Sequence, residues 1–394
     1  MDKGLKRTTF WAIASVYLLI ALEIIIMVSP FAGYFYSVYG PFLKSLSASP
    51  ITSWLTDFFL PHMTFPDDPF LMAVGYIGPL LFYIGLTIFF SAFIPLYWSK
   101  FRGKGVVKGG LYSIVRHPQY LGLAIAGLGI LLYWPRFFIV IMYITMLYLY
   151  YLLARDEEGR MERAFGDAYK DYKASIPMFI PGGPGRWLKG VLPEGRWGSV
   201  YGYIIALVFG IGIAFLLRAY TVTQIPSIKV DNITTISIFP MEEERMKGLI
   251  KIALMDDEVS NMIDEVERVS GRRPPAIYMM PADYAMMGLV SGVKKRYTMD
   301  GGHRHRRGGI WRHLTLLIHH LHMVGGKGVS EPPVMRLFFC EVRHGEERID
   351  DPLGIGVKRV PLFYVDIDTK EGRVIEHLPT PPTHRWGDMP MPAF

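Results

Sequence analysis

The sequence of 394 residues contains a single cysteine, Cys340, and this scarcity limits what the protein can be. One thiol excludes an intramolecular disulfide framework, and it excludes a zinc site built from several cysteines. The sequence also shows no internal repeat and no low-complexity tract. The cysteine count leaves the redox compartment of the protein open.

Acidic residues are scarce in the first 218 residues of the chain. From Ala219 to the end, basic and acidic residues number 23 each, so the net charge of +7 lies entirely in the first part. The connection 99–116 has five basic residues and no acidic one, whereas the connection 36–69 has one basic and three acidic residues. Basic residues at the ends of apolar segments indicate the cytoplasmic side of a membrane. This placement argues against nucleic acid as a partner.

Long apolar segments dominate the same first part. Half of all residues are hydrophobic (51%) and the mean hydropathy is +0.25, which is too apolar for an ordinary soluble protein. About five segments are long enough to cross or nearly cross a bilayer. They are Phe10–Phe35, Phe70–Trp98, Gln119–Trp134, Arg136–Ala154 and Gly198–Leu217. The third and fourth are short and closely joined, which predicts a tight helical hairpin.

The first apolar segment follows three basic residues and lacks a cleavage site of small residues, so we expect a retained span. The charge distribution predicts a multi-pass protein of the plasma membrane, with the N-terminus, the 99–116 connection and the 155–197 segment in the cytoplasm. With five spans, the C-terminal part lies outside. The sequence therefore predicts a mainly α, polytopic membrane helical bundle (residues 1–218) fused to a C-terminal α+β soluble domain (residues 219–394).

The C-terminal part alternates strand and helix patterns, which favours an α+β domain. We expect strands in Ser227–Phe239, Met335–Val342, Val357–Asp366 and Arg373–His377, and helices in Met241–Ser270 and Ile310–Val324. The Asp366–Gly372 region resembles a calcium loop but lacks the later ligands, so a hairpin is favoured. The pattern of strand, turn and strand is vaguely similar to PepSY-type domains. The tail from Leu378 is expected to be extended.

The stretch Gly110–Gly122 reads GLYSIVRHPQYLG and stands directly before an apolar helix. Pro118 suits the first turn of a helix, because its missing N–H would be unpaired there anyway. The next backbone N–H groups, together with Arg116 and His117, predict a site for an anion. A charged pair at the mouth of a membrane helix is costly without a polar ligand.

A second polar block, which includes Glu157 and Glu158, follows the hairpin and runs on to Pro181. Since the hairpin is short, its two ends return to the same side of the membrane, so these glutamates are expected near Arg116 and His117. Cationic groups on one wall and carboxylates on the other fit a zwitterion with hydroxyl groups, such as S-adenosylmethionine. Aromatic faces of Tyr112, Tyr120 or Tyr169 would stabilise its sulfonium by cation–π attraction.

The two blocks together resemble the superfamily of isoprenylcysteine carboxyl methyltransferases and phospholipid methyltransferases, which are integral-membrane enzymes. That family has Gly-x-Tyr-x-x-Val-Arg-His-Pro-x-Tyr-x-Gly, a helical hairpin, a Glu-Glu block and Phe-Gly-x-x-Tyr-x-x-Tyr. The resemblance covers about residues 105–182. The chain departs from the pattern at Met161, where Leu is frequent, and at Met178, where many members have Arg.

The resemblance implies an enzyme that uses S-adenosylmethionine as cofactor, without a metal. It assigns the cofactor-binding role to Arg116, His117, Tyr120, Glu157 and Glu158, and Gly127 and Gly129 match a Gly-x-Gly that related enzymes use for close approach to the cofactor. Tyr112 is added as a cofactor-binding residue for its aromatic face. Of the two glutamates we favour Glu158 as the ligand. For the transfer itself, position alone suggests Arg155 as the group that orients an acidic acceptor and Tyr169 as part of the methyl-transfer channel.

The resemblance predicts methyl transfer to a lipid-like or prenylated acceptor, either a carboxylate or an amine, whose tail enters from the bilayer. One alternative is a non-catalytic, methyltransferase-like subunit that scaffolds a larger complex. A second alternative is a metal- or haem-handling protein that uses the histidine cluster 303–322. The C-terminal domain has no assigned role, and a protein partner for it is left open.

Two further polar features stand apart from the motifs. Glu23 lies within the first apolar segment with no charge beside it, and a carboxylate there is functional by default. It either pairs with a basic group of the pocket or is protonated against another helix. Asn232-Ile233-Thr234 is a glycosylation sequon, which matters only if this part of the chain lies outside.

Overall fold

A computed structural model of the chain describes residues 3–38, 42–62, 64–102, 107–180, 196–230, 232–282, 289–292, 295–299 and 332–380. The contacts between residues divide the chain into two compact units. The first unit joins Met1–Leu43, Ile77–Trp134 and Phe138–Ile213, and the second joins Lys44–Tyr76, Pro135–Phe137 and Ala214–Phe394. The second unit therefore includes short pieces of chain from between the apolar segments, which the sequence did not indicate.

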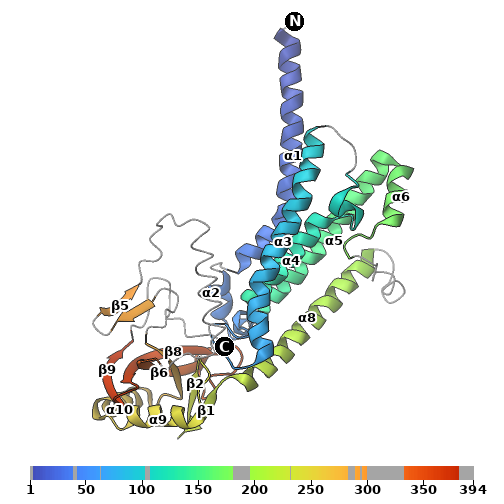
Figure 1. Cartoon of the computed structure of the whole chain (residues 1–394). Coiled ribbons are helices and arrows are strands. Elements are labelled where there is room, and N and C mark those ends of the chain that lie inside the picture. Colours follow the sequence, from blue (N-terminus) through green and yellow to red (C-terminus); the bar gives the residue numbers. More distant parts are fainter. Residues whose placement is uncertain are drawn as a thin grey trace. The chain divides into compact units, whose positions relative to one another are not determined.

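Helices make up the first unit (Figure 1). They are α1 (Lys3–Ser37), α3 (Pro69–Phe101, from Ile77 on), α4 (Pro118–Tyr133), α5 (Phe137–Phe165), α6 (Asp167–Ser175) and the first part of α8 (Arg196–Gln224). In the described part of the chain, four helices are long and apolar enough to cross a membrane: Tyr17–Ser37 of α1, α3, α5 and Trp197–Gln224 of α8. The helix α4 is apolar but shorter. The predicted membrane helical bundle is confirmed, with four long helices and one short one.

The short helical hairpin is formed by α4 and α5, as the sequence predicts. Pro118 occupies the first turn of α4, and Trp134 ends it by donating its backbone N–H to Ile130 O at 2.8 Å. The helix α5 continues beyond its apolar part to Phe165, about three turns past Ala154. The polar residues that follow the apolar segment are therefore presented on a rigid helix.

Glycines allow α3 and α4 to approach each other closely. A Cβ atom at Gly85 would lie 2.2 Å from Ala126 N, one at Gly122 would lie 2.6 Å from Phe89 N, and one at Gly129 would lie 2.5 Å from Gly78 O. All three clashes are with backbone, which cannot give way as a flexible side chain does. Small residues at such crossings are typical of helices that pack inside membranes.

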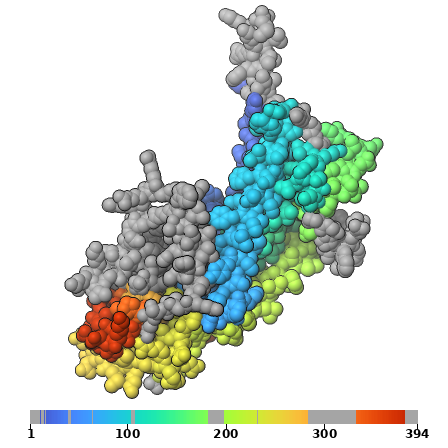
Figure 2. All heavy atoms as spheres, viewed as in Figure 1, coloured from blue at the N-terminus to red at the C-terminus, as the bar shows by residue number. Residues whose placement is uncertain are grey.

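The outward faces of the long helices are apolar. On α3, which faces the viewer in Figure 2, residues such as Leu80, Phe90 and Ile94 are exposed. In the most apolar part of α8, only 6% of the residues are buried in the structure. Apolar side chains over whole helix faces are stable in contact with lipid rather than with water.

A mixed β-sheet forms the centre of the second unit, in the order β1-β2-β3-β6-β8-β9, with β7 paired to β6. Its strands are β1 (Ser227–Val230), β2 (Ile233–Ser237), β3 (Ala276–Pro281), β6 (Val334–His344), β7 (Glu347–Arg348), β8 (Lys358–Asp368) and β9 (Arg373–Pro379). Only β2 and β3 are parallel, and the helices α9 (Glu243–Leu254) and α10 (Asp257–Ser270) connect them. A separate hairpin consists of β4 (Leu289–Gly292) and β5 (Lys295–Met299).

Both faces of this sheet are buried. One face packs against α9 and α10 through residues such as Leu249, Val259 and Phe339. The other face includes Tyr278 and Cys340, both fully or almost fully buried. Two buried apolar faces explain why β6 and β8 read as continuous apolar runs rather than as alternating patterns. The predicted mixture of strands and helices in this part of the chain is confirmed.

Several predicted elements differ in detail. The segment Met241–Ser270 is two helices, because Asp256 begins a new helix by accepting the backbone N–H groups of Glu258 and Val259, both at 3.1 Å. The strand β3 was not predicted. The turn before β9 is a hairpin, as favoured, in which Asp368 accepts the N–H groups of Lys370 and Glu371. The predicted helix Ile310–Val324 and most of the tail lie outside the described residues.

The connection 44–76 belongs to the second unit and contains α2 (Phe42–Ser47, from Lys44 on) and the 3₁₀ turn η1 (Ser53–Thr56). The Arg218 guanidinium donates to Phe58 O at 2.6 Å and to Leu353 O at 2.9 Å. The Asp57 carboxylate accepts the N–H of Gly356. These bonds fasten the connection to α8 and to the loop before β8.

Candidate functional site

The residues before α4 are held by the chain that follows α6. The 3₁₀ turn η2 (Gly110–Ser113) begins at Gly110, whose φ of +63° favours glycine. Beyond it, the N–H groups of Arg116 and His117 donate to Pro177 O at 2.9 Å and to Met178 O at 3.1 Å. The Arg-His-Pro segment and the Pro177-Met178 segment that follows the second polar block therefore lie side by side.

His117 stands between two neighbouring carboxylates of α5. Its Nδ1 lies 3.4 Å from Glu157 Oε2, and its Nε2 lies 3.3 Å from Glu158 Oε1. The tight α4–α5 hairpin brings these groups together, as the sequence predicts. The anion that the Arg-His pair led us to expect at this helix start is supplied here by the chain's own carboxylates.

Glu158 is more enclosed than Arg116, His117 and Glu157, with a side chain only 3% exposed. Arg116 Nε donates to its Oε1 at 2.8 Å, and Lys173 Nζ lies 3.2 Å from its Oε2. Arg116 also donates to the carbonyls of Lys173 and Ile176. Both oxygens of Glu158 are therefore occupied by cations of the protein.

Glu157 is more accessible, with a side chain 23% exposed. The hydroxyl of Tyr120 donates to its Oε1 at 2.5 Å. The Tyr120 ring is buried and stacks on Tyr150 at a centroid distance of 4.8 Å. Of the two glutamates, Glu157 thus has the surface with which a ligand can make contact, whereas we had favoured Glu158 from the sequence.

His117 is the titratable group that lies between the two glutamates of the site. Burial lowers the pKa of His117, but its hydrogen bonds to Glu157 and Glu158 and their negative charges outweigh that effect, so its pKa is raised above the ordinary value. Both carboxylates favour the form of His117 that is protonated at both ring nitrogens, because that form can donate to each of them. We call Arg116, His117, Glu157 and Glu158 the charged array.

The tyrosines near the two glutamates keep their hydroxyl groups un-ionised. Burial, followed by the charge of Glu157, raises the pKa of Tyr112, and burial with the charge of Glu158 raises the pKa of Tyr169. Tyr112 donates to Gln119 Oε1 at 3.2 Å, and Tyr172 donates to Tyr112 O at 2.6 Å. At neutral pH none of these phenols acts as a base, so they serve as hydrogen-bond donors and aromatic surfaces.

Lys173 is a site residue that we did not single out in the sequence. It lies on α6 four residues after Tyr169, so both belong to one face of the helix. Besides Glu158 it pairs with Glu162 at 2.6 Å. The spacing of Tyr169, Tyr172 and Lys173 was available as a signal, but the sequence alone does not show which face of α6 packs against α5.

Gly127 and Gly129, predicted to approach the cofactor, make contacts of helix packing. A Cβ at Gly127 would lie 2.8 Å from Met146 Cε of α5, and the carbonyl of Gly127 accepts the hydroxyl of Tyr34 at 2.8 Å. Gly129 packs against α3, as described above. Their role toward a cofactor stays a prediction that these contacts do not support.

Arg155, predicted to orient an acceptor, is exposed on α5. Its guanidinium lies 5.7 Å from the centroid of the Tyr151 ring. The contacts described for Arg155 do not include Glu157, Glu158 or His117. The catalytic role of this residue also stays a prediction.

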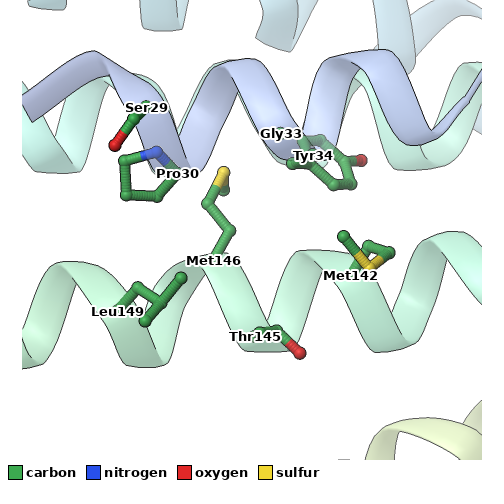
Figure 3. A pocket seen from close by; sticks show the side chains of 8 residues that line it. All are labelled: Ser29, Pro30, Gly33, Tyr34, Met142, Thr145, Met146 and Leu149. Carbon is green, nitrogen blue, oxygen red and sulfur yellow. The ribbon is translucent and has the colours of Figure 1, made fainter. Parts of the chain in front are cut away.

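A cavity of about 200 Å³ lies between α1 and α5 (Figure 3). Pro30 and Tyr34 of α1 and Met142, Thr145 and Met146 of α5 are among the residues that line it. Its wall is mostly apolar. Tyr150 connects the neighbourhood of this cavity with the site. Its hydroxyl accepts the N–H of Phe31, the residue after Pro30, at 3.1 Å, and its ring stacks on the ring of Tyr120.

Within the described residues, no group of three or more histidine, cysteine and acidic side chains has an arrangement that could hold a metal ion. The histidine cluster 303–322 lies outside the described residues.

The long apolar helices, the α4–α5 hairpin and the charged residues at its polar end define a multi-pass membrane protein with a cluster of buried charges. Residues 69–168 match the family model of phospholipid methyltransferases, which confirms the predicted superfamily for this region. A curated relative is the protein-S-isoprenylcysteine O-methyltransferase of Schizosaccharomyces pombe, 31% identical over 77 residues. The match covers 19% of this chain and 33% of the relative, so the chain spans about a third of its length. No solved structure matches the chain.

Proposed function

We propose that this protein is a methyltransferase that uses S-adenosylmethionine and transfers the methyl group to a lipid-like or prenylated acceptor. The observation that carries the proposal is the array of Arg116, His117, Glu157 and Glu158. It joins both halves of the family pattern at the end of a membrane hairpin. The array is not closed, because the side chain of Glu157 is partly exposed, and this accessible carboxylate is the part of the array that a ligand can contact.

The residues of the site fit the chemistry of this cofactor. Glu157 offers a partly exposed carboxylate oxygen to an ammonium group or to ribose hydroxyls. The rings of Tyr120 and Tyr169 are buried, and Tyr120 stacks with both His117 and Tyr150, so the predicted cation–π contact of these rings with a sulfonium stays a prediction. When bound, S-adenosylmethionine supplies an electrophilic methyl group. Glu158, enclosed by Arg116 and Lys173, is proposed to hold the array in place rather than to contact the ligand.

The protein's part in such a transfer is to position the two reactants and to exclude water. His117 fixes the two carboxylates relative to each other through its two ring nitrogens. Tyr120 orients the Glu157 carboxylate by its hydroxyl. A carboxylate acceptor needs no base, whereas an amine acceptor must first lose a proton.

An apolar acceptor tail is supported by the cavity between α1 and α5 and by the name of the relative, which acts on isoprenylcysteine. We propose that the acceptor enters from the bilayer and that its tail lies along this cavity. The acceptor is then a membrane lipid or a lipid-modified molecule.

For the orientation, we propose a plasma-membrane protein whose cofactor site faces the cytoplasm. The basic 99–116 connection and the basic N-terminus support this side. Counting α4 as a crossing gives five spans, which would leave the C-terminal domain outside.

The test is calorimetric titration of S-adenosylmethionine into the detergent-purified full chain. We expect binding in the micromolar range, and a loss of at least tenfold in affinity for His117→Ala and for Glu157→Gln, because each removes part of the charged array. Lys170→Gln is the matched control: this exposed lysine of α6 pairs only with its helix neighbour Asp167 among the contacts described, and its removal should leave the affinity unchanged.

Absence of binding to a folded wild-type protein would refute the proposal and would favour a scaffold that keeps the fold without the reaction. Binding that is unchanged in both array variants would place the cofactor elsewhere.

A further inference from the structure

Polar contacts attach the helix α1 to its neighbours. The carboxylate of Glu23 forms an ion pair with the ammonium of Lys100, in the last turn of α3. Of the two alternatives for Glu23, pairing with a basic group is therefore the one that the structure has. About two turns later, the backbone N–H of Phe31 donates to the hydroxyl of Tyr150 at 3.1 Å. Because Tyr150 lies in the middle of α5, this bond joins two long apolar helices.

Pro30 is the reason that side chains bond to the backbone of α1 at this point. It has no N–H, so the carbonyl of Ile26 lacks its usual helical donor and accepts the hydroxyl of Ser29 at 3.0 Å. The N–H that follows the proline, that of Phe31, has the Tyr150 hydroxyl as a partner. Prolines are tolerated in membrane helices where side chains supply such partners. Tyr150 therefore supports the local structure of α1 as well as that of α5.

The ring of Tyr150 extends this contact to the site. It is buried and stacks on the ring of Tyr120 of α4 at a centroid distance of 4.8 Å. The Tyr120 ring stacks in turn on the ring of His117 at 5.6 Å, and the Tyr120 hydroxyl donates to Glu157 Oε1 at 2.5 Å. Direct contacts between side chains thus lead from the backbone of α1 to the accessible carboxylate of the charged array.

Glu157 depends on this support more than Glu158 does. Glu158 is held by the cations Arg116 and Lys173, and the contacts described for those two side chains do not include Glu157. Glu157 has the Tyr120 hydroxyl at one oxygen and His117 Nδ1 at 3.4 Å from the other. Its side chain is also the more exposed of the two, so the direction of its carboxylate is set mainly by Tyr120.

We propose that Tyr150 is a positioning residue of the cofactor site. It fixes the Tyr120 ring relative to α1 and α5, and thereby the direction in which Glu157 presents its carboxylate. The inference rests on the proposed use of S-adenosylmethionine and adds a residue that acts on the site through another residue. A carboxylate that is already oriented loses less freedom when a ligand binds, so such support raises affinity.

The test compares two tyrosines of α5 that each form a hydrogen bond of 3.1 Å with a backbone group. Tyr150 accepts the N–H of Phe31, and Tyr143, about two turns earlier, donates to Ala124 O. Calorimetric titration of the detergent-purified full chain measures the affinity for S-adenosylmethionine. We expect Tyr150→Phe to lower it about threefold, and Tyr150→Leu, which also removes the stacked ring, at least about tenfold.

Tyr143→Phe is the matched control. It removes a hydrogen bond of the same kind, but the ring contacts described for Tyr143 do not include Tyr120. The melting temperature should therefore fall by a similar amount in Tyr143→Phe and Tyr150→Phe, whereas the affinity should fall only in Tyr150→Phe. A purely structural role of Tyr150 would not separate the two measurements. If Tyr150→Leu does not fold, the two phenylalanine variants still decide the question.

A second substitution tests the route through Tyr120. Tyr120→Phe keeps a ring for the stack with Tyr150 but removes the hydrogen bond to Glu157. In this background Tyr150→Phe should cause no further loss of affinity, because the link that it acts through is already broken. Losses that simply add in the double variant would show that Tyr150 acts by another route and would overturn the inference.

The outcomes separate this inference from the proposed function. If the wild type binds S-adenosylmethionine and Tyr150→Phe binds it equally well, the positioning role is overturned and the methyltransferase proposal stays intact. The same holds if Tyr143→Phe lowers the affinity as much as Tyr150→Phe. A folded wild type without affinity for S-adenosylmethionine overturns the proposed function, and this inference with it.

Discussion

Each of the two units contains a buried ionic group, and the two groups are built differently. In the second unit, Arg336 and Asp366 face each other across β6 and β8 and form a bidentate pair, Nε to Oδ1 and Nη2 to Oδ2, both at 2.6 Å. The Arg336 guanidinium also lies 4.1 Å from the centroid of the Tyr364 ring. In the first unit, the array around His117 has longer contacts and ends on a carboxylate that is partly exposed.

The difference teaches that burial of charge is by itself no sign of a functional site. The Arg336–Asp366 pair is closed, because both carboxylate oxygens are taken by one guanidinium, and it fixes the register of two strands. The array of the first unit is open at Glu157, whose side chain is partly exposed. A partly exposed charged group at the edge of such a cluster indicates a ligand site, whereas the number of buried charges does not.

The largest loss of stability is expected from breaking the Arg336–Asp366 pair. Asp366→Asn leaves the Arg336 charge buried without its carboxylate, which should lower the free energy of unfolding of the second unit by about 3–5 kcal/mol. Loss of hydrogen-exchange protection in the amides of β6 and β8 measures it. The double variant Arg336→Met, Asp366→Leu should be much less harmful, and the affinity for S-adenosylmethionine should not move. The comparison would be contradicted if Asp366→Asn lowered only the affinity for S-adenosylmethionine and left the stability of the second unit unchanged.

A smaller loss of stability is expected from a substitution at the close contact between α3 and α4 in the first unit. Gly129→Ala places a Cβ against the Gly78 carbonyl, and the required shift of α3 from α4 should lower the free energy of unfolding by about 1–3 kcal/mol. Thermal unfolding in detergent measures this change. Gly75→Ala on α3, where nothing lies within 4 Å of the added atom, should be neutral or slightly stabilising. Equal effects of both substitutions would refute the packing argument.

The stability of the first unit should depend on pH through the titration of His117. Because the pKa of His117 is raised in the folded protein, its stabilising contribution is complete below the ordinary value of about 6.5 and is lost as the pH rises through the folded pKa. The melting temperature of the wild type should therefore fall gradually on the alkaline side of this value, and His117→Gln should flatten that slope. A slope that persists in the variant would assign the titration to another group.

The smallest effect is expected at Arg155. Its side chain is exposed and contacts the ring of Tyr151, so Arg155→Gln should change stability by less than about 0.5 kcal/mol and methyl transfer by less than about twofold. A radiolabelled-methyl assay with membrane lipid or a prenylated acceptor measures the rate. A large fall in rate with unchanged cofactor affinity would restore Arg155 as the group that orients the acceptor.

The sequence predicts the elements of the first unit well, because apolar length and Pro118 determine them locally. The helices α3 and α4 begin within a residue of the expected positions. In the second unit β3 was missed, since the prolines at 274 and 275 and a buried apolar run of six residues resemble a loop as much as a strand. The split between α9 and α10 depends on the cap at Asp256, which a continuous helical pattern hides.

For the site, the hairpin length predicts that His117 meets Glu157 and Glu158. The contact of Lys173 with Glu158 was not predictable, because it depends on how α6 is rotated against α5. The exposure of Arg155 has the same cause. One helical residue of rotation, about 100°, decides whether a charge points at the site or away from it.

The lone cysteine has a practical consequence. Cys340 is fully buried in β6, and burial raises the pKa of its thiol, so very little reactive thiolate is present in the folded chain. The native protein is therefore expected to react very little with maleimide reagents. A single cysteine introduced at Lys108, which is exposed in the basic connection, or at Asn232, which is exposed in the β1–β2 turn, would be labelled by an impermeant reagent only from its own side of a sealed vesicle.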